Sequence, residues 1–353
     1  MLYDFNEIIK AFNVKGSIKE VEQIDTGLIN QTFKVTLEDN SKYIIQRINH
    51  NVFKDIDGLM DNVFNVTSFL KEKGLTERYA LKFLLTKEGK HYFRKDDSYF
   101  RMYIYVDNAL TYDTSEDLSI IKEIGKGFGN FQNLLHDFPI NTLNDTIVDF
   151  HNTPKRYEQL EKAKEVNYQN RLEECLDLYN KYLEVKDIAC QISTLNLPLR
   201  VTHNDTKCNN VLIDENTHKS LAVIDLDTIM PGLSVFDFGD SIRSIATSVI
   251  DTRKDYDKAS LRLDKYEAYT KGFLSQVKSS LTKLEIENLS LGAITMTIEC
   301  GVRFLTDYLN GDTYFKTKYE KHNLFRAYSQ INLALSMIEN KKEMDEIIKK
   351  CLK

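Results

Sequence analysis

The order of apolar and polar positions divides the chain into two parts with different patterns. In the first part, apolar residues alternate with polar ones over short segments separated by polar turns, which is typical of half-buried strands. The strands predicted in this way cover 20–25, 31–37, 42–48, 80–85 and 99–106. Apolar positions at helical spacing predict helices over 5–13 and 55–73. These elements describe a small β-rich unit with one long helix.

After about residue 107 the apolar positions follow a helical period. The predicted helices cover 115–136, 154–194, 254–280, 282–309 and 320–351. They are interrupted at 198–240, where the short apolar runs 199–201, 210–213 and 221–224 predict small strands joined by loops. A β-rich part followed by a helical part is the organisation of protein-kinase-like folds. We therefore expect an α+β bilobal fold, with a small lobe at 1–107 and a large, mainly helical lobe at 108–353.

Composition narrows the classes of partner. The net charge of −6 leaves no basic surplus for nucleic-acid phosphates. The five cysteines are scattered, without a CxxC pair or a Cys/His cluster, so we expect reduced thiols rather than a zinc site. The N-terminus lacks the basic and apolar regions of a signal peptide, and no apolar run approaches the ~20 residues that span a bilayer. The sequence thus predicts a cytoplasmic protein, a monomer, with neither nucleic acid nor membrane as a partner.

The stretch that carries chemistry is His-x-Asp-x-x-x-x-Asn, formed here by His203, Asp205 and Asn210. Phosphoryl transfer requires a carboxylate that orients the attacking hydroxyl, oxygen ligands for Mg²⁺, and a cation near the transferred group. We interpret Asp205 as the base, Asn210 as a metal ligand and Lys207 as the cation that meets the γ-phosphate of ATP. His203 is expected to hold the loop. Asn209 is excluded as the ligand because it falls one residue short of the spacing.

Asp225 is expected to complete the metal site. It ends an apolar strand 15 residues after Asn210, and a hairpin that turns near 214–217 returns the chain to the same place. Asp227 follows closely and is a possible second carboxylate near Mg²⁺. Asp237-Phe238-Gly239 spells a protein-kinase metal motif, but it follows a 230–232 turn and leads into a helix. We expect Asp237 either to cap that helix or to accept backbone hydrogen bonds from the catalytic loop.

The β-rich part, 1–107, is expected to bind ATP. Its candidate nucleotide-binding residues are Gly27, Asn30, Thr32, Arg47, Tyr103 and Tyr105. Arg47 is the cation expected on the α- and β-phosphates, because it shares a strand face with Tyr43 and Ile45. Its predicted partner on the helix is Asp61 or Glu72. Residues 103–106 are expected to form the hinge that meets adenine through backbone groups.

Together these segments resemble the aminoglycoside phosphotransferase/choline kinase superfamily, and within it the N-acetylhexosamine 1-kinases. The similar segments are 43–49, 149–154, 203–210, 223–233 and 303–315. The resemblance implies transfer of a phosphoryl group from Mg²⁺-ATP to the anomeric hydroxyl of N-acetylglucosamine or N-acetylgalactosamine. The second part, 108–353, would then hold both the catalytic residues and the acceptor. A kinase of another small hydroxyl acceptor, of the choline, thiosugar or aminoglycoside type, remains the alternative.

The resemblance also implies residues for the acceptor. Asp205 would position the anomeric hydroxyl, and Arg303 and Tyr314 would help to bind the sugar. A planar donor suits sugar oxygens, and an aromatic surface suits the ring. His151 is a further candidate for the acceptor site, with a structural, hydrogen-bonded histidine as the alternative.

Overall fold

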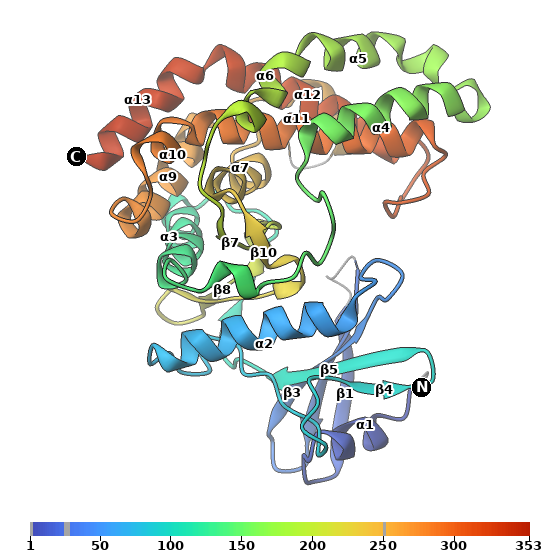
Figure 1. The fold of residues 1–353 in the computed structure, drawn as a ribbon, viewed down its shortest axis with the longest axis vertical. Coiled ribbons are helices and arrows are strands. Elements are labelled where there is room, and N and C mark those ends of the chain that lie inside the picture. The colour runs from blue at the N-terminus through green and yellow to red at the C-terminus, as the bar shows by residue number, and fades with distance from the viewer. Residues whose placement is uncertain (1–2, 25–28, 250–251) are drawn as a thin grey trace.

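The computed structural model describes residues 3–24, 29–249 and 252–353 as a small lobe with an antiparallel sheet and a larger helical lobe (Figure 1). The sheet runs in the order β1-β2-β3-β5-β4. Its strands are β1 (Ile18–Ile24), β2 (Gln31–Leu37), β3 (Lys42–Ile48), β5 (Ser98–Ile104) and β4 (Phe93–Lys95). The α+β bilobal prediction is confirmed.

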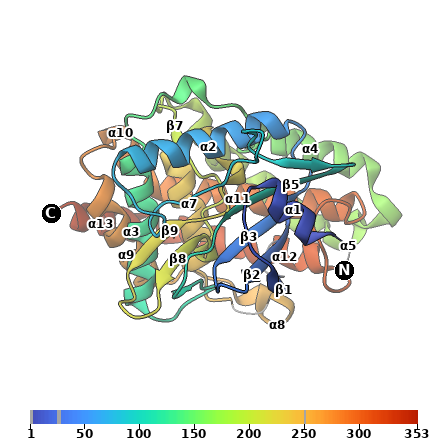
Figure 2. The same cartoon turned by 90° about the horizontal axis from the view of Figure 1, so that it is seen from below.

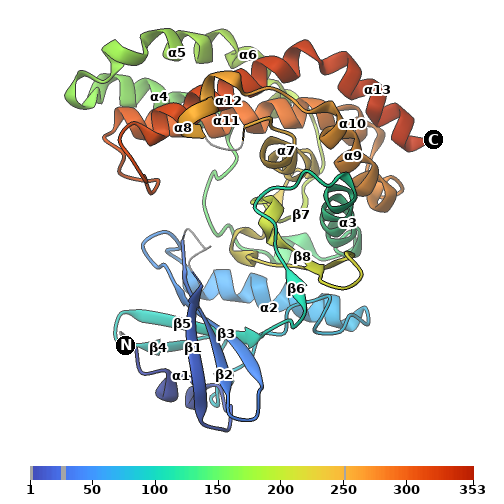
Figure 3. The same ribbon diagram turned by 180° about the vertical axis from the view of Figure 1, so that it is seen from behind.

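The two faces of this sheet have different neighbours. Helix α1 (Phe5–Ala11) packs on one face in a core with Phe33, Ile45 and Met102. Helix α2 (Ile56–Glu72) belongs to the second core, which contains Ile44 from the opposite face and continues into the larger lobe. Figures 1 and 3 show α2 between the strands and the larger lobe, with α1 on the far side. Because side chains alternate along a strand, the parity of a residue decides which core it meets.

The larger lobe is built from helices that lie behind the sheet when viewed from the small lobe (Figure 2). They are α3 (Leu118–Leu134), α4 (Thr153–Val166), α5 (Leu172–Glu184), α6 (Lys186–Cys190), α7 (Ser234–Ile245), α8 (Thr252–Asp255), α9 (Leu263–Val277), α10 (Lys283–Glu287), α11 (Leu289–Leu309), α12 (His322–Glu339) and α13 (Lys341–Leu352). Contrary to the sequence expectation, α11 is long and apolar enough to cross a membrane by composition. Its most apolar stretch is 78% buried, however, as in the core helix of a helical lobe.

Helices α7 and α11 cross at two glycines. A Cβ added to Gly239 would lie 2.3 Å from the carbonyl oxygen of Gly292, and one added to Gly292 would lie 2.3 Å from that of Val235. Since real Cβ atoms do not approach backbone oxygens this closely, only glycine permits the crossing. The contact fixes the separation of two helices that both carry residues of the candidate site.

Short strands connect the helices near the lobe junction. The hairpin of β8 (Val211–Asp214) and β9 (Ser220–Val223) turns at Asp214, whose side chain accepts the backbone N–H groups of Asn216 and Thr217 at 3.0 and 2.8 Å. This turn lies where it was predicted. β6 (Ala109–Leu110) pairs with β8, so pairing with the larger lobe begins just after residue 107. That position supports our proposed lobe boundary between residues 107 and 108.

Three details of the pattern-based prediction are wrong. Residues 80–85, all described, form only an isolated bridge from Phe83 to Tyr103, and the edge strand is β4. The predicted helix 154–194 is broken after α4, where Asn167 adopts a left-handed conformation with φ 41°. Residues 230–232 are not a turn but β10 (Met230–Gly232), which pairs with β7 (Arg200–Thr202). Pro231 is tolerated there because proline can occupy the edge of a small sheet.

Candidate active site

The loop that follows β7 is held by a carboxylate from α7. Asp237 accepts the backbone N–H of His203 at 2.9 Å and that of Asn204 at 2.7 Å, and Nε2 of Gln132 donates to it at 2.8 Å. Asp237 is 1% exposed. Its oxygens are therefore engaged with the loop, as the second of its two predicted roles requires. This contact explains why Asp237-Phe238-Gly239 is not a metal motif here.

His203 fixes the same loop from the inside. Its Nε2 lies 2.8 Å from the carbonyl oxygen of Ile224, so Nε2 carries the proton and Nδ1 accepts the backbone N–H of Asp205 at 3.3 Å. The Thr228 hydroxyl donates to the carbonyl oxygen of His203 at 2.6 Å. The ring is fully buried and serves as a structural spacer between two segments of the site.

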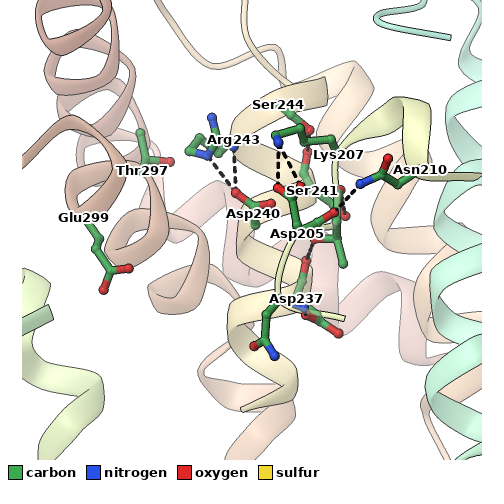
Figure 4. A network of polar contacts seen from close by, with 12 residues as sticks. Asp205, Lys207, Asn210, Asp237, Asp240, Ser241, Arg243, Ser244, Thr297 and Glu299 are labelled. Carbon is green, nitrogen blue, oxygen red and sulfur yellow. Dashed lines mark hydrogen bonds and ion pairs between the residues drawn. The ribbon is translucent and has the colours of Figure 1, made fainter. Parts of the chain in front are cut away.

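Asp205 projects from this loop toward Lys207, whose Nζ lies 2.8 and 2.9 Å from its two oxygens (Figure 4). Burial raises the pKa of Asp205, but the ammonium of Lys207 and its hydrogen bonds outweigh burial, so the pKa lies below its ordinary value. The same pair, acting against burial, raises the pKa of Lys207. The carboxylate is ionised at neutral pH and only partly exposed, so it can orient a hydroxyl.

Asn210 and Asp225 meet across the β8–β9 hairpin. The pairing of Val211 with Val223 places them at the same end, where the backbone N–H of Ile224 donates to the Asn210 carbonyl oxygen at 2.9 Å. The Asn210 amide nitrogen donates to the Asp205 carbonyl oxygen at 2.8 Å, which leaves its amide oxygen for a ligand. Asp225 is exposed and adopts a left-handed conformation.

The donor set fits a magnesium ion that is shared with a nucleotide. Enclosure between the lobes, together with the negative charges of Asp227 and Asp205, raises the pKa of Asp225 to about 6, although its side chain still reaches solvent. Concentrated negative charge of this kind favours a bound cation. No cluster of three or more His, Cys, Asp or Glu side chains that could hold a metal occurs in 3–24, 29–249 or 252–353. A carboxylate and an amide oxygen suffice for Mg²⁺ when phosphates supply further ligands.

The structure does not bring Arg47 to this site, which corrects the sequence expectation. Arg47 shares the α1 face of the sheet with Ile45, and its Nε donates to the Ser98 hydroxyl at 3.0 Å. The neighbouring Gln46 takes the inner face instead. The buried cation there is Arg101 of β5, whose Nε donates to Gln46 at 2.9 Å and which forms an ion pair with Asp227. Sequence reasoning missed Arg101, because the cation comes from the adjacent strand.

The remaining candidates for the nucleotide site have varied positions. Thr32 lies on the inner face and accepts a 3.1 Å hydrogen bond from Gln46. Asn30 donates to Asp227 and accepts the backbone N–H of Asn49 at 2.9 Å, so its amide is already engaged. Gly27 lies outside the described residues.

The expected hinge and the expected helix carboxylate have other partners. Tyr103 is buried, which raises its pKa, and the backbone N–H of Tyr105 donates to the Lys42 carbonyl oxygen at 3.1 Å. That N–H is therefore not free for adenine, and the hinge contact stays a prediction. Neither helix candidate meets a strand cation, because Asp61 contacts His91 at 3.1 Å and Glu72 is exposed at the end of α2.

His151 is structural rather than open to an acceptor, which corrects its assignment as a substrate-binding residue. Asn152 caps α4, so His151 sits directly before the helix, where its Nε2 lies 2.9 Å from the Asn204 carbonyl oxygen and its Nδ1 lies 2.8 Å from Glu299. Both neighbours are acceptors, so both ring nitrogens donate. Burial lowers the pKa of His151, but Glu299 more than compensates and raises it. The Thr153 hydroxyl binds the other Glu299 oxygen at 2.6 Å.

Arg303 lies one helical turn after Glu299 on α11 and is surrounded by aromatic rings. Its guanidinium lies 5.2 Å from the ring centre of Phe150, 5.5 Å from that of Phe315 and 5.9 Å from that of Tyr314. Tyr314 is 58% exposed. Because Phe150 directly precedes His151, Arg303 and the rings around it lie next to the hydrogen bond from His151 to the Asn204 carbonyl oxygen.

A carboxylate that sequence reasoning missed holds the Tyr314 loop. Asp307 of α11 accepts the backbone N–H groups of Thr313, Tyr314 and Phe315 at 2.8–2.9 Å. The arrangement repeats that of Asp237: a helix carboxylate that binds consecutive backbone N–H groups of a functional loop. The signal available in the sequence was the spacing of an acidic residue six to eight positions before the loop.

Asp240 and Arg243 of α7 also lie beside Asp205, between it and the Glu299 side chain of α11 (Figure 4). Arg243 donates to Oδ1 of Asp240 at 2.7 and 2.9 Å. Oδ2 of Asp240 is buried and has no hydrogen-bond partner among the described residues. A buried carboxylate oxygen without a donor is costly.

Comparison with known proteins agrees with this fold. Residues 20–271 match the profile of the phosphotransferase enzyme family, APH. An aminoglycoside phosphotransferase from Alicyclobacillus acidocaldarius is similar in structure, with a TM-score of 0.64 at 12% identity over 100% of this chain and 97% of that one. Choline kinase from Cryptosporidium parvum gives 0.56 at 18% identity over 94% and 91%. Amicoumacin kinase hAmiN, in complex with AMP-PNP and Ca²⁺, gives 0.63 at 13% over 94% and 93%.

The fold is that of the kinase-like proteins with two lobes. Since the family match covers more than half of its length, the chain belongs to the APH phosphotransferase family. It is therefore assigned to the phosphotransferases, the enzymes that this family contains.

Proposed function

We propose that this protein transfers the γ-phosphoryl group of ATP to the anomeric hydroxyl of an N-acetylhexosamine, N-acetylglucosamine or N-acetylgalactosamine, and so forms the sugar 1-phosphate. Residues 1–107 would hold the nucleotide, and residues 108–353 the acceptor. Asp205 orients the hydroxyl and accepts its proton as the oxygen attacks. Lys207, paired with Asp205 before substrates bind, is within reach of negative charge on the transferred group. When the Lys207 ammonium moves from Asp205 to the phosphoryl oxygens, the pKa of Asp205 would rise, and Asp205 would become a stronger base.

Asn210 and Asp225 would hold Mg²⁺ on the nucleotide phosphates, where it neutralises charge that develops during transfer. Three features support this assignment: the free amide oxygen of Asn210, the exposure of Asp225, and the negative charge gathered around it. Removal of free Mg²⁺ with EDTA should therefore abolish turnover, and excess Mg²⁺ should restore it.

The observation that carries the acceptor proposal is the group formed by Arg303, Phe150, Tyr314 and Phe315. A guanidinium framed by aromatic rings offers flat apolar surface for a sugar ring and several donors for its oxygens and its acetamido carbonyl. A cationic acceptor would instead be repelled by Arg303. The Asp205 loop is tied to the same region through His151, which supports an acceptor site close to the proposed base.

A second candidate is a kinase of another small acceptor, of the choline, thiosugar or aminoglycoside type. One observation favours an aminated acceptor: Oδ2 of Asp240 has no partner among the described residues and would suit an ammonium group. Arg243 already offsets much of the Asp240 charge, however, and a sugar hydroxyl can donate to the same oxygen.

A substrate panel separates the two candidates. The protein is incubated with Mg²⁺-ATP and, in turn, both N-acetylhexosamines, glucose, choline and an aminoglycoside, and ADP release is measured. The Asp205→Asn variant gives the background from ATP hydrolysis. We expect turnover with at least one N-acetylhexosamine, and ³¹P NMR should show an anomeric phosphate. Absence of turnover with both sugars, alongside turnover with an amine, would replace the first candidate by the second.

A further inference from the structure

The carboxylate of Asp227 joins the two lobes. It is 3% exposed and follows Asp225 by two residues on the larger lobe. Oδ1 forms an ion pair with Nη1 of Arg101 on β5, and Oδ2 accepts a hydrogen bond from the Asn30 amide nitrogen before β2. Both donors belong to the small lobe, so each oxygen of this carboxylate is engaged across the junction.

Arg101 is built into the inner face of the sheet. It is 1% exposed, its Nε donates to Gln46 at 2.9 Å, and Gln46 donates in turn to Thr32 at 3.1 Å. Strands β2, β3 and β5 therefore all contribute to holding this guanidinium. A buried charge is retained only when a partner compensates its lost hydration, and Asp227 is the carboxylate that does so.

The neighbouring backbone reinforces the junction. Asn62 of α2 donates from its amide nitrogen to the carbonyl oxygens of Ile229 at 2.8 Å and Asn144 at 2.7 Å. Its amide oxygen accepts the backbone N–H of Asn144 at 2.8 Å. The segment from Asp227 to Ile229 is thus bound to β5, to α2 and to the residue before β2.

The chemistry of Asp227 differs from that of Asp225. A metal ligand must offer a free oxygen, whereas Oδ2 of Asp227 accepts the Asn30 amide and Oδ1 is in an ion pair with Arg101. A guanidinium in contact also repels a second cation. Asp225 is exposed, and within 3–24, 29–249 and 252–353 its side chain has no ion pair or hydrogen bond. The two carboxylates therefore suit different roles although they are two positions apart: Asp225 suits a metal, and Asp227 suits contact with the small lobe.

We propose that Asp227 is a positioning residue that clamps the lobes around the nucleotide, with Arg101 as its counter-ion, and that it is not a ligand of the metal. The pair occupies the place where a strand cation and a helix carboxylate were expected. In this chain the cation is on β5 and its partner is on the larger lobe. Loss of either partner should loosen the nucleotide site without changing the demand for Mg²⁺. The inference does not depend on the identity of the acceptor.

The test uses binding of AMP-PNP, so no acceptor is required. Asp227→Asn, Arg101→Gln and the double variant are titrated with AMP-PNP at saturating Mg²⁺ and then with Mg²⁺ at fixed AMP-PNP, by calorimetry. Each single variant should weaken AMP-PNP binding about 10-fold, the order of one lost charged hydrogen bond. The double variant should bind AMP-PNP no more weakly than the weaker-binding single variant, because both substitutions remove the same interaction. The Mg²⁺ concentration at half-saturation should stay within about twofold.

Asp225→Asn is the matched control, and it should raise the Mg²⁺ requirement by about 10-fold or more, as for loss of a charged ligand. If Asp227→Asn raises the requirement as Asp225→Asn does, or if the two single effects add, the proposal is overturned. Unchanged or tighter AMP-PNP binding by Asp227→Asn would overturn it as well. Should these variants not fold, two milder ones replace them: Arg101→Lys, which keeps the charge, and Asn30→Ala, at a half-buried position. Both are titrated in the same way, and we expect smaller losses of AMP-PNP affinity.

Discussion

The two halves of the candidate site are held in place by different kinds of contact. In the larger lobe, the catalytic loop is fixed through its backbone: Asp237 binds two N–H groups, and His151 binds the carbonyl oxygen of Asn204. In the small lobe, the polar residues are fixed through side chains that cross from strand to strand, from Thr32 to Gln46 to Arg101.

This difference decides how each half tolerates change in sequence. A loop held by its backbone keeps its geometry when its outward side chains vary, so the spacing of Asp205 and Asn210 can be preserved while the rest of the loop changes. A strand site depends on parity, since a shift of one position moves a side chain to the other face. In the small lobe, a cation on the inner face of the sheet can also come from a neighbouring strand, as Arg101 does here.

The largest expected effect concerns the loop. Asp205→Asn keeps the shape of the side chain but removes the carboxylate that orients and deprotonates the acceptor. We expect kcat to fall by about 10²-fold or more, the usual contribution of a general base, while ATP binding is retained. Steady-state kinetics and AMP-PNP titration measure the two quantities. Nearly normal kcat would assign the base elsewhere.

The adjacent asparagines allow a matched comparison within the loop. Asn210→Ala removes the amide oxygen proposed for the metal and the hydrogen bond to Asp205. It should raise the Mg²⁺ concentration for half-maximal rate by about 10-fold. The Asn209 side chain donates a hydrogen bond to Asp113 near the surface, at 2.9 Å, so Asn209→Ala should change that value by less than about twofold. Equal effects of the two substitutions would refute the spacing argument.

The His151–Glu299 pair gives a pH-dependent effect on stability. The pKa of His151 is raised above 6.5 and that of Glu299 is lowered below 4.5, so both charges exist between these values. The stabilisation from His151 is complete below pH 6.5 and is lost as the pH rises through its raised pKa.

We therefore expect His151→Gln to lower the free energy of unfolding by about 1–3 kcal/mol near pH 6, as for a buried charged hydrogen bond. The difference from the unmodified protein should shrink between pH 6.5 and 9 in thermal or urea unfolding. Glu299→Gln should show the same trend, because it removes the same pair. A difference that grows with pH would mean that His151 is neutral in the folded protein.

The smallest effect should come from the predicted cation that proved to lie on the outer face. Arg47→Met removes one hydrogen bond to Ser98 at a partly exposed position. AMP-PNP affinity should change by less than about twofold, as is usual for a surface polar contact. A loss of 10-fold or more would mean that Arg47 reaches the phosphates when the nucleotide binds.

Much of the larger lobe's half of the site could be predicted from the sequence. The structural role expected of His203 and the hairpin turn at Asp214 depend on neighbours close in sequence or on one hairpin. They agree with the structure because local spacing limits the possible geometry. The proposed chemistry of Asp205, Asn210 and Asp225 still awaits experiment.

The parts that could not be predicted depend on distant pairing. Arg101 meets Asp227 across 126 positions, and no local pattern relates the two. Arg47 was assigned to the wrong face because the sequence shows which residues share a face, not which helix covers it. His151 could be placed before a helix, but its contact with Glu299 depends on the packing of α4 on α11.

The glycine crossing of α7 and α11 has a consequence for how enzymes of this fold can diversify. Asp237 and Asp240 are carried by α7, whereas Glu299, Arg303 and Asp307 are carried by α11. The two backbones touch at Gly239 and Gly292, so the helices cannot slide or separate without losing that contact. New acceptor preferences should therefore arise by exchange of side chains along α11 and in the 311–315 loop. The distance from base to acceptor would be inherited unchanged, and a library that varies those side chains would be the economical starting point for redesign.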